Sequence, residues 1–190
     1  MSHALPVEAA PDLGTAVTKS EIARSLAAGV IAGQIAGLIM VGVMATVFTV
    51  FLGEGPLYPL QVIGSLLFGD RALSGFRLPS SVAGLVLHQL GPCFFWGGWF
   101  GLVTHFFGIH RGSRLLALGI ATGVVSQVVD VNLILPVAFQ ALHGHDIWAE
   151  RVPAFWSWAS HVVFGVGLAS FSVVYDYLGA APSSSLARAR

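Results

Sequence analysis

Long apolar stretches separated by short polar segments dominate this sequence. Four of them, residues 26–52, 82–107, 115–139 and 154–178, are long enough to cross a hydrocarbon core about 30 Å thick, which takes on the order of 20 helical residues. A fifth apolar stretch, residues 58–68, is too short to cross and contains Pro59. The pattern predicts an all-α membrane protein, a four-transmembrane-helix bundle with a short interfacial or re-entrant helix in its first outer loop.

Composition supports the same class. Of the 190 residues 55% are hydrophobic and 9% are charged, whereas a soluble domain has about 25% charged residues. Nine basic and nine acidic residues balance, so there is no large basic surface for nucleic acid. The single cysteine, Cys93, lies in an apolar stretch, which excludes a disulfide framework and a cysteine-based zinc motif.

Basic residues predict the orientation, because cytoplasmic flanks hold an excess of Lys and Arg. The two ends and the middle loop carry six basic residues, Lys19, Arg24, Arg111, Arg114, Arg188 and Arg190. The two other loops carry three, Arg71, Arg77 and Arg151. We therefore expect a multi-pass protein of the cell inner membrane with both termini cytoplasmic. Residues 1–25 form a cytoplasmic N-terminal tail without the features of a signal peptide, 26–178 the transmembrane domain, and 179–190 a disordered C-terminal tail.

Glycines recur at four-residue spacing in the first and third spans, at Gly29, Gly33, Gly37, Gly119 and Gly123. The second and fourth spans each follow a proline, Pro79 or Pro153, with a histidine eight or nine residues later. This similarity indicates a tandem duplicated helical hairpin. Glycine stripes let a neighbouring backbone approach closely. We expect these faces to pack tightly inside one bundle. The alternative is homo-oligomerisation through the same faces. In either case the lipid bilayer surrounds the protein as a partner.

Ionisable residues fall at one depth in three spans. His88 lies nine residues after Pro79, His161 eight residues after Pro153, and Asp130 nine residues before the third span ends, all roughly 12 Å from the outer side. Such residues usually face a bundle interior. Together with two amides they form a predicted buried polar layer, His88, Asp130, His161, Gln127 and Asn132.

Two prolines lie near this layer. Pro92 and Pro136 cannot donate a backbone hydrogen bond, so they would leave the carbonyls of His88 and Asn132 unpaired. Freed carbonyls beside a carboxylate and two imidazoles could hold a proton, a cation or water.

Three interpretations of the layer remain open. In the first, interhelical hydrogen bonds stabilise a structural or accessory membrane protein. In the second, the layer relays protons or cations in a small transporter or channel. In the third, His88 and His161 hold a haem or a divalent metal. Nucleophile elbows, phosphate loops and metalloprotease motifs are missing from the sequence, so we assign no catalytic residue.

The second outer loop carries a weaker candidate site. Its four members, His143, His145, Asp146 and Glu150, offer nitrogen and oxygen ligands that suit a divalent metal if the loop folds back on itself. The alternative is an ordinary solvated loop.

Several segments carry a resemblance. They are the glycine-stepped residues 29–37, Pro56-Leu-Tyr-Pro59 before a short apolar segment ending in Leu66-Leu-Phe-Gly69, and Ser160-His161-Val-Val-Phe164-Gly165 in the last span. With these the chain resembles a family of small four-span bacterial inner-membrane proteins that has no assigned activity. The likeness extends over residues 26–177. It implies the membrane topology and carries over no catalytic residue.

Overall fold

The computed structural model describes residues 13–180, which form helices and connecting turns without any strand. Residues 1–12 and 181–190, and with them most of the predicted disordered tail, lie outside the described residues. Three helical stretches are long and apolar enough, by length and composition, to cross a membrane. These are Lys19–Phe51, Gly112–His143 and Ala154–Ala180. The chain is therefore an all-α protein with the features of a membrane protein.

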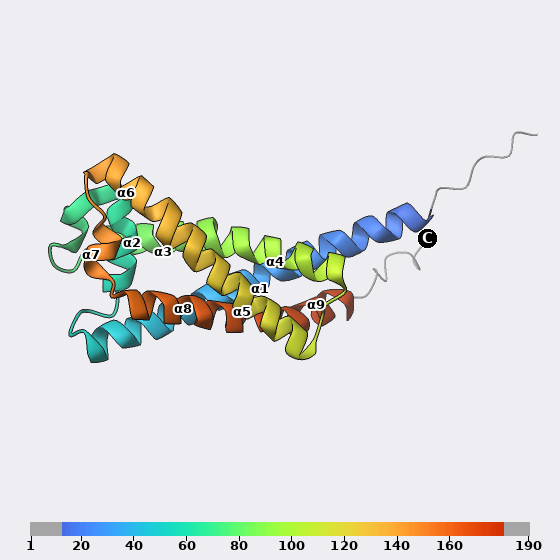
Figure 1. The fold of residues 1–190 in the computed structure, drawn as a ribbon. Coiled ribbons are helices and arrows are strands. Elements are labelled where there is room, and N and C mark those ends of the chain that lie inside the picture. The colour runs from blue at the N-terminus through green and yellow to red at the C-terminus, as the bar shows by residue number, and fades with distance from the viewer. Residues whose placement is uncertain (1–12, 181–190) are drawn as a thin grey trace, which may run out of the picture.

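The elements combine into four long helical rods with short helices at one end (Figure 1). In chain order they are α1 (Leu13–Phe51), α2 (Tyr58–Phe68), η1 (Gly69–Leu73), α3 (Leu78–His88), η2 (Gln89–Cys93), α4 (Phe94–Phe107), α5 (Gly112–Ser126), η3 (Gln127–Ile134), α6 (Leu135–His143), α7 (Ile147–Arg151), α8 (Ala154–Gly167), η4 (Leu168–Ser170) and α9 (Phe171–Ala180). The segments η2 and η3 are π-helical, and η1 and η4 are 3₁₀-helical. Because η2, η3 and η4 continue the helices on either side, the rods cover residues 13–51, 78–107, 112–143 and 154–180.

The second rod differs from the expectation of four equivalent spans. It is continuous from Leu78 to Phe107, yet it is not among the helices apolar enough to cross a membrane. The polar side chains of His88 and Gln89, followed by Pro92, interrupt its apolar sequence. The first rod also begins earlier than expected, because α1 includes residues 13–25 that were predicted as tail.

Short helices lie together at the end of the bundle opposite the start of α1 and the end of α9 (Figure 1). Helix α2 has the bounds that the sequence predicted, with Pro59 in its first turn, where a missing N–H costs nothing. It packs closely on α3, because a Cβ on Gly64 would collide with the carbonyl of Ser80, and one on Gly84 with that of Leu60. Helix α7, in the second loop at this end, was not predicted.

The first pair of rods crosses through glycine. A Cβ on Gly29 of α1 would collide with the carbonyl oxygen of Gly97 in α4, and one on Gly33 with the carbonyl oxygen of Cys93. Only glycine permits this backbone approach, which gains van der Waals contact that lipid does not already supply.

The second pair of rods crosses in the same way. A Cβ on Gly119 of α5 would collide with the carbonyl oxygen of Gly165 in α8, and one on Gly123 with that of His161. The contacts of the two crossings follow one constant register, in which Gly29 and Gly33 match Gly119 and Gly123, while Cys93 and Gly97 match His161 and Gly165. Both halves of the chain therefore contain a long helix, a short helix and a second long helix that crosses the first through small residues.

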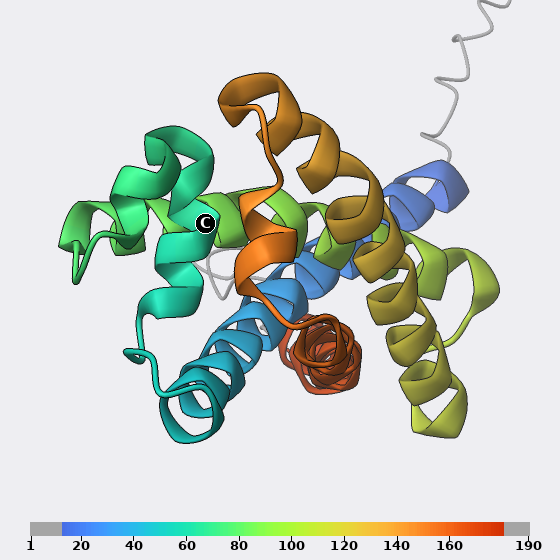
Figure 2. The same ribbon diagram turned by 60° about the vertical axis from the view of Figure 1, so that its left-hand side comes forward.

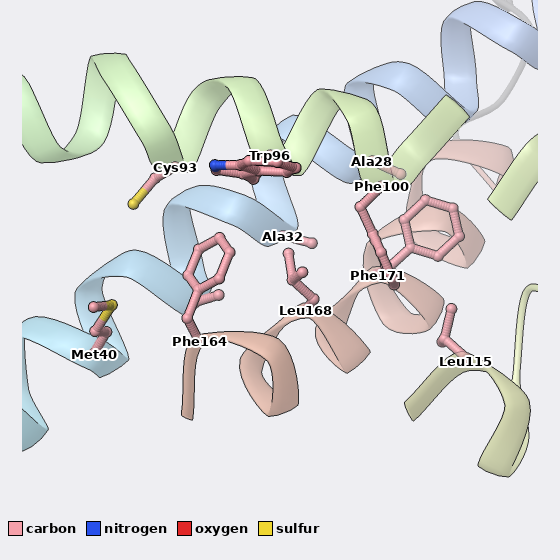
Figure 3. Packing of buried hydrophobic residues seen from close by; sticks show 11 residues of the cluster. Ala28, Ala32, Met40, Cys93, Trp96, Phe100, Leu115, Phe164, Leu168 and Phe171 are labelled. Carbon is pink, nitrogen blue, oxygen red and sulfur yellow. The ribbon is translucent and has the colours of Figure 1, made fainter. Parts of the chain in front are cut away.

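The halves meet around α1 and α8, which lie side by side (Figure 2). Gly167 of α8 lies against Ala36 of α1, where a Cβ would be crowded. Toward the end of the bundle where α9 ends, Phe100 and Phe171 meet edge to face with centroids 5.7 Å apart (Figure 3). Glycine and alanine keep the helices close together at the crossings. Larger side chains fill the space beside these close contacts.

Candidate ligand cavity

A cavity of about 610 Å³ lies between the second and third rods. Both π-helical segments border it, with Gly91 and Pro92 from η2 and Val129 and Val131 from η3. Most of its other lining is aliphatic or aromatic. Each π turn contains or precedes one of the prolines noted above, and π turns frequently occur at functional sites.

The structure brings three predicted residues to this cavity: His88, Asp130 and His161 line the same space. They come from three different rods. Both histidines are buried with 7% of their surface exposed, and Asp130 is half-buried.

Asp130 is held by a partner that the sequence analysis missed. Trp96 Nε1 donates a hydrogen bond of 2.7 Å to Asp130 Oδ2. Among the side chains of residues 19–180 no other donor reaches this carboxylate and no cationic group lies within ion-pair distance of it. The signal was available, because a buried indole N–H in mid-span needs an acceptor.

The two histidines differ in their bonding. His161 Nδ1 lies 2.9 Å from the carbonyl oxygen of Ser157, so Nδ1 carries the hydrogen and a neutral ring leaves Nε2 as an acceptor. The only hydrogen-bond partner of the His88 ring in the described part of the chain is Cys93 Sγ, 3.6 and 3.7 Å from its two ring nitrogens. Each imidazole thus keeps bonding capacity for a ligand.

Gln127 and Asn132 form a side branch of the layer. The buried Gln127 accepts a hydrogen bond of 3.0 Å from Ser157 Oγ and donates one of 3.1 Å to Asn132 Oδ1. Neither amide lines the cavity. Asn132 is exposed, because the π turn carries it toward the outside of the bundle, so it lies at the edge of the predicted layer.

The four candidate metal ligands of the second outer loop do not converge. His145 bonds Glu150 (Nδ1, 2.8 Å) and Asp70 (Nε2, 3.2 Å), while His143 Nε2 donates to the Leu66 carbonyl at 3.1 Å. Asp146 caps α7 by accepting the N–H of Ala149. Between residues 19 and 180 no three His, Cys, Asp or Glu side chains gather as a metal site would require. The loop instead fastens α7 to η1.

The bonds of His145 change its titration. The hydrogen bond to Glu150, followed by the charges of Glu150 and Asp70, raises the pKa of His145 above the ordinary 6.5. The imidazolium form, which donates from both nitrogens, suits a position between two carboxylates.

Comparison with known proteins adds no identity, since no protein-family model, curated protein or solved structure matches the chain.

Proposed function

We propose that the chain is a four-span protein of the cell inner membrane whose cavity binds a small, largely apolar molecule within the bilayer. The observation that carries this proposal is the space of about 610 Å³ into which two buried histidines and a carboxylate project. Its size lies within the roughly 300–1,000 Å³ typical of ligand sites, and apolar walls with a few convergent polar groups are typical of them too.

The topology in this proposal takes the second rod as a span despite its lower apolarity. Its 30 residues from Leu78 to Phe107 are long enough. The start of α1 and the end of α9 lie at one end of the bundle (Figure 1). Arg24 and Arg111 bond Tyr175 and Asp176 of α9, so this end would be cytoplasmic. Reporter fusions at the loops near residues 75, 110 and 145 test this orientation, with the middle loop expected inside and the other two outside.

A lateral opening to lipid supports entry from the membrane. Leu90 and Phe95 on one side and Ile134 on the other line the cavity while 52–69% of their surface is exposed. In a bilayer these side chains would meet lipid tails. An apolar molecule dissolved in the membrane can therefore reach the cavity without crossing water.

The matching of the two halves favours a binding role over a purely structural one. In the register of the glycine crossings, Asp130 corresponds to Met40 and Trp96 to Phe164. All four residues line the cavity. Met40 and Phe164 are buried in the hydrophobic core (Figure 3), so the pair that corresponds to Asp130 and Trp96 packs without a polar contact. The proposed repeat therefore does not require a polar pair at this position for its packing.

The other interpretations have less support. Hydrated ions need polar walls, whereas the cavity lining is mostly aliphatic and aromatic. A haem or metal between His88 and His161 gains support from the free Nε2 of His161, and an absorbance spectrum tests it. A Soret band that His88→Ala abolishes would replace our proposal with haem binding.

Filling the cavity is the decisive test. Gly91 lines the cavity, and a Cβ there would meet no atom within 4 Å. Leucine should be tolerated before Pro92, because Leu135 already precedes Pro136 in a helix. Gly42→Leu is the matched control, since Gly42 also has open space around it but does not line the cavity.

Each variant is purified in mild detergent and the retained small molecules are identified by mass spectrometry. We expect the wild type and Gly42→Leu to retain the same apolar compound, and Gly91→Leu to lose most of it. Retention that Gly91→Leu leaves unchanged, or no compound enriched over a detergent blank, would overturn the proposal.

A further inference from the structure

Building on the proposed cavity function, we infer that the ligand is a lipophilic amine, an apolar chain or ring system that carries one protonated amino group. The inference rests on the polar groups that face the cavity and on how many of their hydrogen bonds are already used within the protein.

Asp130 provides the charge that an ammonium group would match. It lies deep in the third rod, and no Lys, Arg or His of the described residues lies within ion-pair distance. Buried charges are normally paired, because an isolated charge in an apolar medium is costly. Trp96 supplies one neutral hydrogen bond to Oδ2, which leaves Oδ1 without a donor from the protein.

The free ring nitrogen of His161 adds an acceptor to the carboxylate of Asp130. His161 Nδ1 is directed to the Ser157 carbonyl, so Nε2 is left to accept. An alkylammonium group brings three N–H donors and no acceptor, which matches the carboxylate of Asp130 and the acceptor nitrogen of His161 in chemical type. Trp96 and Phe164 line the same space, and aromatic faces also favour a cation.

Other head groups fit less well. A carboxylate would add a negative charge beside Asp130. A ketone or quinone oxygen needs donors, but the N–H groups of Trp96 Nε1 and His161 Nδ1 already bond Asp130 and Ser157. His88 alone would be left to supply one. An alcohol can donate but leaves the charge of Asp130 unmatched.

The test compares three probes that share one tail: dodecylamine, dodecanol and dodecanoate. Full-length protein is placed in nanodiscs of phosphatidylcholine at pH 7, and binding is measured by equilibrium dialysis, with protein-free nanodiscs correcting for partition into lipid. Asp130→Asn serves as the charge variant because its amide oxygen can still accept the Trp96 N–H. Gly91→Leu serves as the cavity variant.

We expect saturable binding of dodecylamine at least about tenfold tighter than that of dodecanol, a factor that corresponds to 1.4 kcal/mol, with dodecanoate weakest. Asp130→Asn should reduce the preference to within about twofold, and Gly91→Leu should abolish saturable binding of all three. If Asp130→Asn fails to fold, the ranking of the three probes on the wild type decides.

Failures of the two proposals look different. Equal saturable binding of all three probes, sensitive to Gly91→Leu, would overturn the amine and leave the cavity function standing. A preference for dodecanoate or dodecanol would do the same. Absence of saturable binding for every probe would reject both the amine and the cavity for ligands of this size.

Discussion

Trp96 donates its indole N–H to Asp130 at 2.7 Å, and this bond joins the first half of the chain to the second inside the bundle. The tryptophan lies in α4 and the carboxylate in the π-helical η3. In the register of the glycine crossings the corresponding pair is Met40 and Phe164, both buried in the hydrophobic core. Only one of the two matching pairs is therefore polar.

Removing the donor should weaken the bundle modestly. We expect Trp96→Phe to lower the free energy of unfolding by about 1–2 kcal/mol, since interhelical hydrogen bonds in membranes contribute about 0.6–2 kcal/mol. Thermal unfolding in detergent, followed by the monodisperse fraction, measures the change. Trp99→Phe is the control, because Trp99 is exposed and makes no hydrogen bond in the described structure. Equal effects of the two changes would mean that the bond to Asp130 contributes nothing measurable.

The glycine crossings should tolerate no side chain in either half. We expect Gly33→Ala and Gly123→Ala each to cost about 1–3 kcal/mol, because the added methyl collides with the carbonyl of Cys93 or His161. Gly42→Ala lies in the same long helix as Gly33 but in open space, so it should be neutral or stabilise by up to about 1 kcal/mol. If alanine lowers the free energy of unfolding at one crossing but not at the other, the two crossings do not contribute equally to stability.

The His145 contacts predict a pH-dependent stability. Since the folded-state pKa of His145 is raised above 6.5, its stabilising contribution is fully present below that ordinary value and is lost as the pH rises through the raised folded-state pKa. We expect His145→Gln to be less stable than the wild type at pH 5.5, with the gap narrowing above neutral pH. Melting temperatures of both proteins across pH 5–9 measure this. A gap that is independent of pH would show that the imidazolium charge is not involved.

Arg24 should stabilise the contact between α1 and α9 through its planar shape. Its Nε and Nη2 both donate to the Tyr175 carbonyl, at 2.9 and 2.5 Å, and its guanidinium carbon lies 3.8 Å from the centre of the Tyr175 ring. A lysine keeps the charge but loses the paired donors and the stacking. We therefore expect Arg24→Lys to lower the melting temperature, and Arg114→Lys, at an exposed position, to leave it unchanged. An unchanged melting temperature for Arg24→Lys would show that the charge alone accounts for the contact, and an equal loss for Arg114→Lys would show that the effect does not come from the Tyr175 contact.

The sequence determined the all-α class and the helical stretches. Apolar length and helical rise suffice for this, which is why α2 was predicted with its observed bounds and three stretches proved long and apolar enough to span a membrane. Glycine spacing likewise indicated close crossings, because the stripe it leaves bare depends only on the helical period.

Partner choice was decided by the tertiary structure. The prolines predicted where the helices depart from regular α geometry. Only the structure shows that these departures are the π turns η2 and η3, which direct Asp130 to the cavity and Asn132 away from it. The sequence suggested that His88 and His161 were equivalent by their distance from a proline, whereas the crossings match His161 with Cys93. Hydropathy and spacing report where a residue lies along a helix. Which side chain it meets depends on the rotation of that helix and on the backbone contacts that hold it, and these exist only in the folded bundle.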